Sequence, residues 1–372
     1  MPELAAVGEL SRRLDGMVEL LGELVSIESP SSSPEGVAAC AGRVAAAGHD
    51  LLGTRPETVV TGDVTHLRWR FGASTRVVLL GHADTVWPIG TLARWPFEAD
   101  AARATGPGCF DMKAGLVQLL FAAATLDDLD GVTILVTGDE EVGSRTSREL
   151  IVSTVAGAAA CLVLEPSAAG ALKTARKGVS MYDIDIEGRA AHAGLEPELG
   201  ANATVELAEL VLAINRLGRP EAGTTVTPTT ASAGTAINTV PAAARLHVDV
   251  RAFTEEEQHR VDKALHSLKP AVDGTSMRVD GGPNRPPFPT SASRALFERA
   301  AGLAADLGLP PLSSAEVGGG SDGNFTAGAG VPTLDGLGAV GDNAHAEGEY
   351  VDLASMPQRA ALVAALVSDL LT

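Results

Sequence analysis

Cysteine is scarce in this chain, and the few cysteines stand far apart. Cys40, Cys109 and Cys161 are the only three in 372 residues. Their odd number and wide spacing argue against a disulfide framework and against a cysteine-based zinc site. Free thiols are typical of proteins in a reducing compartment, so we expect a cytoplasmic location.

Basic residues and long apolar runs are also few. The chain has 28 basic against 47 acidic residues, a formal net charge of −19, which argues against nucleic acid or an anionic membrane as a partner. The first residues lack the basic start of a signal peptide. No stretch reaches the run of about 18 apolar residues that a membrane span requires. An anionic substrate would need a local basic pocket in so acidic a chain.

The chain does have ample apolar material for folded cores. Hydrophobic residues make up 45% of it, and its length favours two domains or one large α/β unit. Strand-like runs alternate with helical patterns up to residue 165, which predicts a largely parallel or mixed sheet with helices on both faces. The expected helices are 9–25, 36–47 and 114–129, and the expected strands are 57–60, 66–70, 77–80, 132–137 and 161–164.

A different pattern begins near residue 178. Residues 179–187 alternate strictly between apolar and polar side chains, as a strand with one wet face does. The elements that follow complete a β-α-β-β-α-β order, typical of a ferredoxin-like unit: strand 179–187, helix 201–217, strands 224–231 and 244–253, helix 254–268 and strand 276–279. We interpret 281–287 as a rigid return, after which helix 292–307 rejoins the first domain. The sequence therefore predicts an α/β fold in which domain 178–285 is inserted between 1–177 and 286–372.

Residues that can bind metals stand where the predicted strands end. His82 and Asp84 follow strand 77–80 and point to the same side, so Asp84 can hold one imidazole nitrogen while the other faces a metal. The other members are acids at the ends of apolar runs or the starts of helices, with one late histidine: Asp111, Glu140, Glu141, Glu165 and His345. Carboxyl ends of parallel strands share one sheet edge, so these side chains are expected to converge. The alternative is a series of solvated caps and turn residues.

Six spaced motifs follow one another along the chain: Gly81-His-Ala-Asp-Thr-Val86, Gly106-Pro-Gly-x-x-Asp111-Met-Lys-Ala-Gly115, Asp139-Glu-Glu-Val-Gly-Ser144, Leu164-Glu-Pro166, His192-Ala-Gly194 and Gly318-Gly-Gly-Ser-Asp322. In these motifs the chain resembles the M20 metallopeptidases, and within them the glutamate carboxypeptidases of the carboxypeptidase G type. Several motifs in order are far more specific than any one alone. The resemblance implies a zinc-peptidase α/β sandwich whose inserted domain is a lid-like dimerisation domain, and hence a homodimer.

The resemblance also implies roles for the metal-binding residues. Asp111 bridges two zinc ions, which cobalt or manganese can replace. His82 and Glu165 complete one site, and Glu141 and His345 complete the other. Glu140 is then the general base, and Asp84 orients His82. Relatives hold the peptide after the bridging aspartate in the cis form, so Asp111–Met112 is expected to be cis.

Four further residues resemble the family's substrate contacts. His192 matches a histidine that reaches into the partner subunit's active site to stabilise the tetrahedral intermediate, and Asn238 matches the residue that joins it. Arg251 and Arg285 correspond to arginines near the substrate carboxylate. The expected reaction is cleavage of the amide bond of small N-acyl or aminoacyl amino acids with a free C-terminal carboxylate, releasing glutamate.

Other functions stay open on the sequence alone. A general aminoacylase, an N-acyl-amino-acid deacylase or a dipeptidase of the same family fits the same motifs. Gly319-Gly-Ser321-Asp-Gly323 fits the G-x-S-x-G pattern of serine hydrolases, but residues 312–318 predict no buried strand before it. A non-catalytic metal-binding scaffold is the remaining alternative, and the intact Glu140 argues against it.

Overall fold

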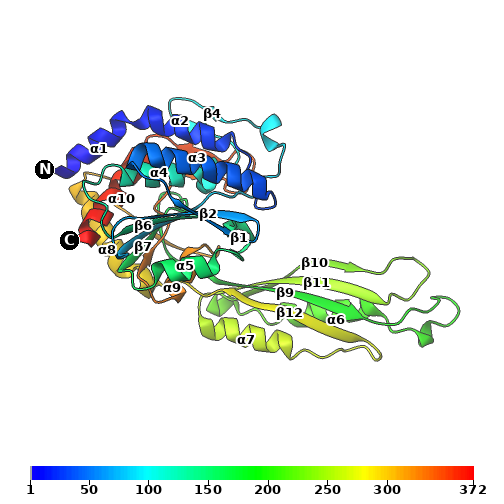
Figure 1. The fold of residues 1–372 in the computed structure, drawn as a ribbon. Helices are drawn as coiled ribbons and strands as arrows, with labels where there is room; N and C mark the ends of the chain where they lie inside the picture. The colour runs from blue at the N-terminus through cyan, green and yellow to red at the C-terminus, as the bar shows by residue number, and fades with distance from the viewer. Residues whose placement is uncertain (1) are drawn as a thin grey trace. The chain divides into compact units, whose positions relative to one another are not determined.

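The computed structural model of the chain describes residues 2–372, which form two compact units (Figure 1). Unit 1 comprises the chain up to Ala175, Phe288–Val317 and Ser321–Thr372. Unit 2 comprises Arg176–Pro287 and Gly318–Gly320. Mixed helices and sheets in two units confirm the α/β fold class that the sequence predicted.

The larger sheet of unit 1 has the strand order β1-β2-β6-β3-β7-β14. β3 pairs in parallel with β6 and β7, and β7 with β14, whereas β1–β2 and β2–β6 are antiparallel. The sheet is therefore mixed. Its strands are β1 (Glu57–Thr61), β2 (Val64–Arg70), β3 (Val77–His82), β6 (Val132–Thr137), β7 (Ala160–Val163) and β14 (Thr333–Leu334).

Helices cover both faces of this sheet (Figure 1). β3 is buried at every position, as its continuous apolar run predicts. Val77 and Leu79 belong to one core, which also holds side chains of α2 (Leu14–Val25), α3 (Pro34–Leu52), α4 (Ala114–Ala123), α8 (Thr290–Asp306) and α10 (Ser355–Leu371). Val78 and Leu80 belong to a second core with α5 (Arg148–Val155) and α9 (Gly323–Gly328). The two-residue period of the strand thus separates the two cores.

The register of the parallel strands brings their carboxyl ends to one edge. His82 at the end of β3 pairs with Thr137 at the end of β6, and Leu80 pairs with Val163 at the end of β7. The residues that follow these strands therefore leave the sheet side by side, which is the arrangement that the predicted metal ligands require.

A small sheet with the order β15-β16-β5-β4 brings two distant loops together. Its strands are β4 (Glu98–Ala99), β5 (Arg103–Thr105), β15 (Gly341–Asp342) and β16 (Tyr350–Asp352). Tyr350 pairs with Thr105. The loop with His345 joins β15 to β16, and the turn with Asp111 follows β5, so the segments that carry both predicted ligands adjoin the same small sheet.

Three expected helices of unit 1 are wrong in extent. The predicted helix 36–47 is too short, since α3 runs from Pro34 to Leu52. The predicted helix 9–25 is interrupted at Arg13 (φ −98°, ψ 5°), which separates α1 (Pro2–Arg12) from α2. The predicted helix 114–129 ends at Ala123, and the apolar residues that prolonged its pattern, Leu126 and Leu129, pack against the core from the loop that follows.

Unit 2 is an antiparallel sheet with the order β10-β11-β9-β12. β9 alternates as predicted: Tyr182, Ile184 and Ile186 are buried in a core with α6 and α7, and the residues between them are more exposed. The elements are β9 (Gly178–Glu187), α6 (Ala203–Asn215), β10 (Thr225–Ala233), β11 (Ala243–Ala252), α7 (Glu255–His266) and β12 (Ser276–Arg285). This is the predicted β-α-β-β-α-β order.

The last strand of unit 2 is longer than predicted. β12 runs through Gly281, Gly282 and Pro283 to Arg285, where the sequence suggested a return outside the sheet. Pro283 is tolerated because β12 is an edge strand, where a missing N–H costs no ladder bond. Gly281 has φ +109°, and a Cβ there would lie 2.1 Å from the carbonyl oxygen of Met181, so glycine is required rather than a sign of a turn.

Within residues 2–372, none of the helices has the length and apolar character to cross a membrane.

Candidate metal centre and active site

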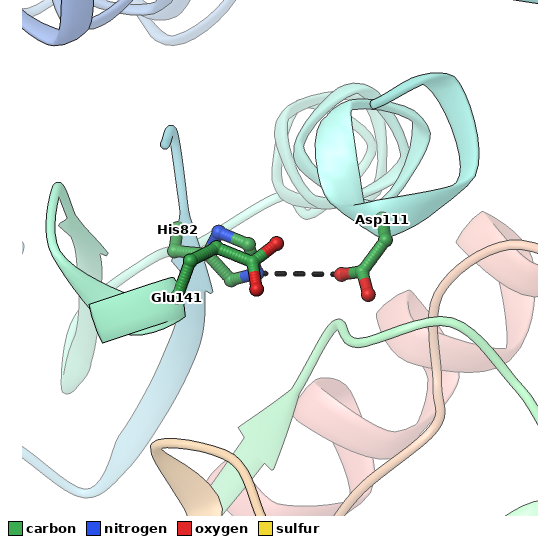
Figure 2. A group of neighbouring side chains, drawn as sticks. All are labelled: His82, Asp111 and Glu141. Carbon is green, nitrogen blue, oxygen red and sulfur yellow. Dashed lines mark ion pairs between the residues drawn. The ribbon is translucent and has the colours of Figure 1, made fainter. Parts of the chain in front are cut away.

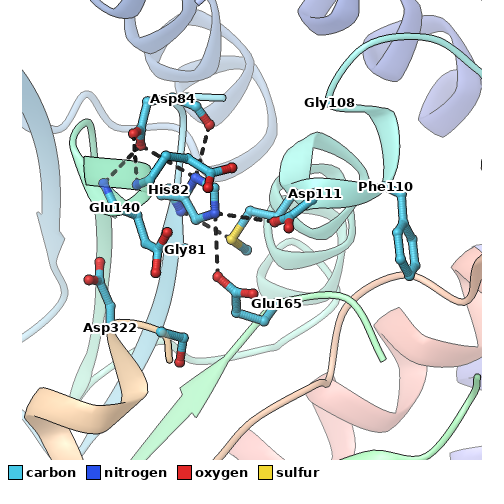
Figure 3. A network of polar contacts seen from close by, with 12 residues as sticks. Gly81, His82, Asp84, Gly108, Phe110, Asp111, Glu140, Glu165 and Asp322 are labelled. Carbon is cyan, nitrogen blue, oxygen red and sulfur yellow. Dashed lines mark hydrogen bonds and ion pairs between the residues drawn. The ribbon is translucent and has the colours of Figure 1, made fainter. Parts of the chain in front are cut away.

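His82 and Asp84 form the base of the site. Both are buried. His82 Nδ1 lies 3.4 Å from Asp84 Oδ1 and 3.0 Å from the Asp84 carbonyl oxygen. Asp84 Oδ1 and Oδ2 also accept hydrogen bonds of 3.1 Å from the backbone N–H groups of Glu140 and Glu141 (Figure 3). Ser31 Oγ donates to Asp84 Oδ2 at 2.6 Å. One buried carboxylate thus orients the imidazole and the loop with both glutamates.

Asp111 projects from a tight glycine-rich turn. Gly108 in this turn has φ +73°, and a Cβ there would lie 2.5 Å from the Thr85 methyl group, so the turn requires glycine. Asp111 itself is non-helical (φ −112°, ψ 97°) between Cys109 and Lys113. The Asp111–Met112 peptide bond is cis, as the resemblance implied.

Two histidines face the two oxygens of Asp111. His82 Nε2 lies 3.4 Å from Asp111 Oδ1, and His345 Nε2 lies 3.4 Å from Asp111 Oδ2 (Figure 2 shows the first pair). His82 Nε2 is also 3.3 Å from Glu165 Oε1, and His345 Nε2 is 3.2 Å from Glu141 Oε2. Each imidazole therefore faces the shared Asp111 and one glutamate of its own.

These separations fit metal ligands. Two ligands bound at about 2.0–2.1 Å to one tetrahedral ion lie about 3.3 Å apart, which is longer than a good hydrogen bond. Three inward-facing atoms that are buried make no hydrogen bond among the described residues: His82 Nε2, Asp111 Oδ1 and Glu141 Oε1. Buried polar atoms without such partners require an explanation, and a bound cation supplies one. The donor set of imidazole and carboxylate suits zinc and similar divalent metals.

Two groups of potential ligands have atoms within 4.8 Å of one another. One is His82, Asp111 and Glu141, and the other is His82, Glu140 and Glu165. Glu140 is buried and lies beside His82 and Glu165 (Figure 3). It is therefore close enough to the ligands to reach a water molecule bound among them.

The electrostatics of the site favour positive charge between these side chains. Burial alone would raise the pKa of Asp111, but the imidazoles of His345 and His82 hold it far below its ordinary value. Asp111 and Glu141 raise the pKa of His345 to about 11. Burial raises the pKa of Glu141 to about 7, although His345 opposes the shift. Either protons or metal ions can neutralise the negative charge of these carboxylates. Metal binding and proton release are therefore coupled at this site.

A second set of contacts fixes the loop that carries Glu140 and Glu141. Asp139 accepts hydrogen bonds from Thr146 N at 2.6 Å and Thr146 Oγ1 at 2.9 Å. Asp322 accepts from Thr137 Oγ1 at 2.8 Å and from Ser144 Oγ. The sequence motifs contained Asp139 and Asp322 but did not indicate these roles, because the partners are hydroxyls several or many residues away.

The other predicted site residues lie in unit 2, at two opposite ends of its sheet. His192 and Asn238 belong to adjoining exposed loops. His192 forms an isolated antiparallel β-bridge with Thr239, and Ala193 N donates a hydrogen bond to the Asn238 carbonyl oxygen at 2.9 Å. Arg251 and Arg285 both pair in register with Val179 at the start of β9. Arg251 is only partly exposed and donates to Asp249 from Nε and Nη2 at 2.8 Å, whereas Arg285 is buried.

Ser321 is not arranged as a hydrolase nucleophile. A strand, β13 (Ser314–Val317), does precede it, but β13 is partly exposed and pairs with β8 (Leu172–Arg176) in a separate two-stranded sheet, so it is not the buried strand that the motif requires. Ser321 is buried, and its Oγ donates to Asp335 Oδ2 at 2.6 Å. A hydroxyl held by a carboxylate supports structure rather than attack on a substrate, since the nucleophile of a hydrolase bonds to a base that faces the cleft.

Comparisons with known proteins agree with this geometry. Residues 78–369 match the family model of peptidase family M20/M25/M40. Carboxypeptidase G2 of Pseudomonas sp. (strain RS-16) is 31% identical over 371 residues, which cover 95% of this chain and 89% of that protein. A succinyl-diaminopimelate desuccinylase of Caulobacter vibrioides is 31% identical over 54% of this chain and 57% of its own length.

The fold is likewise similar to solved structures. An M20 family metallo-carboxypeptidase from Sulfolobus solfataricus superposes with a TM-score of 0.74 at 17% identity, covering 94% of this chain and 98% of that chain. At this level of identity the similarity concerns the fold.

Proposed function

The chain belongs to peptidase family M20/M25/M40 and is a hydrolase of the metallopeptidase and amidohydrolase type; on this premise we propose a two-zinc enzyme that cleaves N-acyl or aminoacyl amino acids with a free C-terminal carboxylate. Glutamate is the proposed C-terminal residue, since the similarity to carboxypeptidase G2 covers most of both chains. Cobalt or manganese can replace zinc in the proposed site.

One observation carries the two-metal proposal. Asp111 Oδ1 lies 3.4 Å from His82 Nε2, and Asp111 Oδ2 lies 3.4 Å from His345 Nε2. A carboxylate with one oxygen toward each of two imidazoles is suited to bridge two ions. Glu165 then completes the site of His82, and Glu141 completes the site of His345. Asp84 holds His82 in the orientation that directs Nε2 to its metal.

Ions held by these residues would polarise the scissile carbonyl as Lewis acids and lower the pKa of the attacking water. Glu140 accepts the proton of this water and delivers it to the nitrogen of the leaving amine. Its position beside His82 and Glu165 supports this role. The backbone bonds from Glu140 and Glu141 to Asp84 keep base and ligand in fixed relative positions.

We further propose that the enzyme is a homodimer in which His192 acts in the partner subunit's active site. His192 and Asn238 follow one end of the unit 2 sheet, and Arg251 and Arg285 lie at the other. Residues 179–187 of β9 separate the two ends by roughly 25 Å at the usual rise per residue. Both sets cannot contact one small substrate in the same subunit, so a second subunit supplies His192. Activity regained on mixing Glu140→Gln with His192→Ala subunits tests this arrangement; no recovery after verified exchange rejects it.

Substrate carboxylate binding is assigned to the arginine end of unit 2. Arg251 uses Nε and Nη2 for Asp249, which leaves Nη1 for a ligand. Together with Arg285 it can supply the planar, charge-assisted contacts that a carboxylate prefers.

An N-acyl-amino-acid deacylase is the second candidate, and the similarity to a succinyl-diaminopimelate desuccinylase favours it. A general aminoacylase or a dipeptidase would share the chemistry and differ in the residue bound. A non-catalytic scaffold would not need the buried Glu140 beside the ligands.

The decisive experiment compares kcat/KM for acyl-glutamate, acyl-alanine and acyl-glutamate α-amide with zinc present. We expect acyl-glutamate to be cleaved fastest and the amide slowest, because the amide discards a charge-assisted contact. Faster cleavage of acyl-alanine would replace the glutamate carboxypeptidase by a general aminoacylase or dipeptidase. Equal cleavage of the amide would reject carboxylate recognition.

A chelator should abolish all three activities. Activity that resists chelation but is lost to a serine-directed phosphonate would favour Ser321 as the nucleophile.

A further inference from the structure

Glu349 is a fully buried carboxylate in the loop that carries His345. Two residues earlier, the side chain of Glu347 is 61% exposed and only approaches Arg94, at 3.7 Å. The two glutamates therefore have the same chemistry and opposite surroundings. A buried carboxylate needs several hydrogen-bond donors to offset its lost hydration.

The donors to Glu349 come from the turn that carries Asp111 and from Trp87. Among the described residues, Glu349 Oε1 accepts from the backbone N–H groups of Phe110 at 2.8 Å and Asp111 at 2.9 Å. Glu349 Oε2 accepts from Gly108 N at 3.1 Å and from Trp87 Nε1 at 2.9 Å. Three of these donors are main-chain amides of one tight turn. Hydrogen bonds to a charged acceptor are roughly twice as strong as neutral ones.

These bonds connect two predicted ligands that are distant in sequence. Asp111 and His345 are 234 residues apart, yet Asp111 Oδ2 and His345 Nε2 lie 3.4 Å from each other. The strand pairing of Tyr350 with Thr105 brings the two loops near one another but does not reach Asp111. Glu349 does reach it, since it binds the amide of Asp111 itself.

We propose that Glu349 is a positioning residue for the metal centre, because its carboxylate fixes the backbone of Gly108, Phe110 and Asp111 and thereby sets Asp111 between His82 and His345. The inference rests on the proposed two-zinc function. The positions of metal ligands depend on such outer contacts, and losing one typically weakens metal binding by about 10–100-fold.

Glutamine at position 349 tests the inference at almost constant shape. Its side chain keeps one acceptor oxygen and replaces the other by an NH₂ donor. In either orientation the NH₂ group faces two N–H donors, so one pair of hydrogen bonds is lost. Glu347→Gln makes the same chemical change in the same loop at an exposed position and is the matched control. Trp87→Phe removes one donor and leaves the three main-chain bonds.

The measurement is the zinc dissociation constant of each full-length variant by chelator competition, together with the melting temperature with and without zinc. Glu349→Gln should bind zinc at least about tenfold more weakly and show a smaller zinc-induced rise in melting temperature. Glu347→Gln should match the wild type, and Trp87→Phe should weaken binding by a smaller factor. For acyl-glutamate at saturating zinc, kcat should fall more than KM changes.

A purely structural role makes a different prediction: Glu349→Gln would lower the melting temperature of the metal-free protein and leave the zinc dissociation constant unchanged. That outcome overturns the inference. If Glu349→Gln does not fold, Trp87→Phe decides, and a dissociation constant within about twofold of the wild-type value overturns it. A wild-type protein that binds no zinc would reject the proposed function itself, whereas zinc binding that is equal in wild type and Glu349→Gln rejects only the positioning role.

Discussion

The two units place their charged residues in opposite ways. In unit 1, His82, Asp84, Glu140 and Glu165 are buried at one edge of the sheet. In unit 2, most charges of the sheet stand on its outer face, where Asp185 pairs with Arg245 at 2.6 Å and with Arg278 at 2.9 Å, and Arg285 at the end of β12 is a buried exception. The side chains of Arg245 and Arg278 are more than half exposed. Such exposed pairs contribute little to stability, because solvent and salt screen their charges.

This contrast separates chemistry from support. Buried acids in unit 1 are unfavourable unless a cation or several donors accompany them, so their convergence indicates function. The sheet of unit 2 satisfies ordinary folding rules: an apolar inner face packs on two helices and a charged outer face contacts solvent. Changes at this edge of unit 1 should therefore affect metal binding and turnover. Changes in the core of unit 2, away from the proposed contacts at the two ends of its sheet, should affect stability.

The largest effect is expected from Asp111→Asn. The amide cannot supply two charged oxygens to two ions, so both sites should lose affinity and activity should fall to the detection limit. Metal content after gel filtration and kcat/KM test this. A variant that retains two zinc ions per subunit would contradict the bridging role.

Glu140→Gln and Glu141→Gln should separate base from ligand. Glu140→Gln removes the proton acceptor, so kcat should fall by about 10²–10⁴-fold while zinc content stays at the wild-type level. Glu141→Gln should lower zinc content first. Elemental analysis measures the zinc content of the two variants, and single-turnover kinetics measures their chemical step. Equal zinc loss in both variants would reject the assignment of Glu140 as base and Glu141 as ligand.

Leu246→Ala tests the supporting unit. Leu246 is fully buried in the unit 2 core, and truncating a buried leucine costs about 2–5 kcal/mol. We expect a lower urea midpoint for unfolding of unit 2 and an unchanged zinc dissociation constant. The zinc dissociation constant is measured by isothermal titration after the chelator has been removed. Weaker zinc binding in this variant would contradict the proposed division of roles between the two units.

The smallest effect concerns a polar cluster in unit 2 and depends on pH. Arg260, with Thr224 and Arg219, lowers the pKa of Glu257 to about 2, against an ordinary value of 4.5. A lowered folded-state pKa stabilises the fold above about pH 4.5, and this contribution disappears as the pH falls towards 2. Glu257→Gln should therefore lower the urea midpoint at pH 7, and its difference from the wild type should narrow by pH 3. A difference that is constant with pH would contradict the shifted pKa.

Much of unit 1 was predictable from sequence because its signals are local and strong. The apolar run of β3, the acids at strand ends and the glycine-rich turn before Asp111 each have one simple structural interpretation. The family resemblance supplied the pairing of ligands and the cis bond, which no periodicity could indicate.

Other features depend on contacts that the sequence does not reveal. Glu347 and Glu349 are indistinguishable in a polar loop, and only the folded turn at Gly108 makes one of them buried. Gly281 and Pro283 are typical of turns, yet they belong to β12, because an edge strand tolerates proline and a close backbone approach requires glycine. The break at Arg13 follows no recognisable signal in the helical pattern.

The discontinuity of unit 1 has a consequence for biosynthesis. Unit 2 is almost entirely the continuous segment Arg176–Pro287, whereas the sheet of unit 1 needs β14 at Thr333–Leu334 and its proposed metal centre includes His345. The 180 residues between Glu165 and His345 take about 9–36 s to translate at 5–20 residues per second. During this interval the strands before residue 165 lack β14 and the segment with His345, whereas unit 2 can already fold. We expect ribosome-bound chains stalled near residue 320 to resist proteolysis in unit 2 and to be cleaved before residue 175. The proposed zinc site would then be completed, and loaded, only after most of the chain has been synthesised.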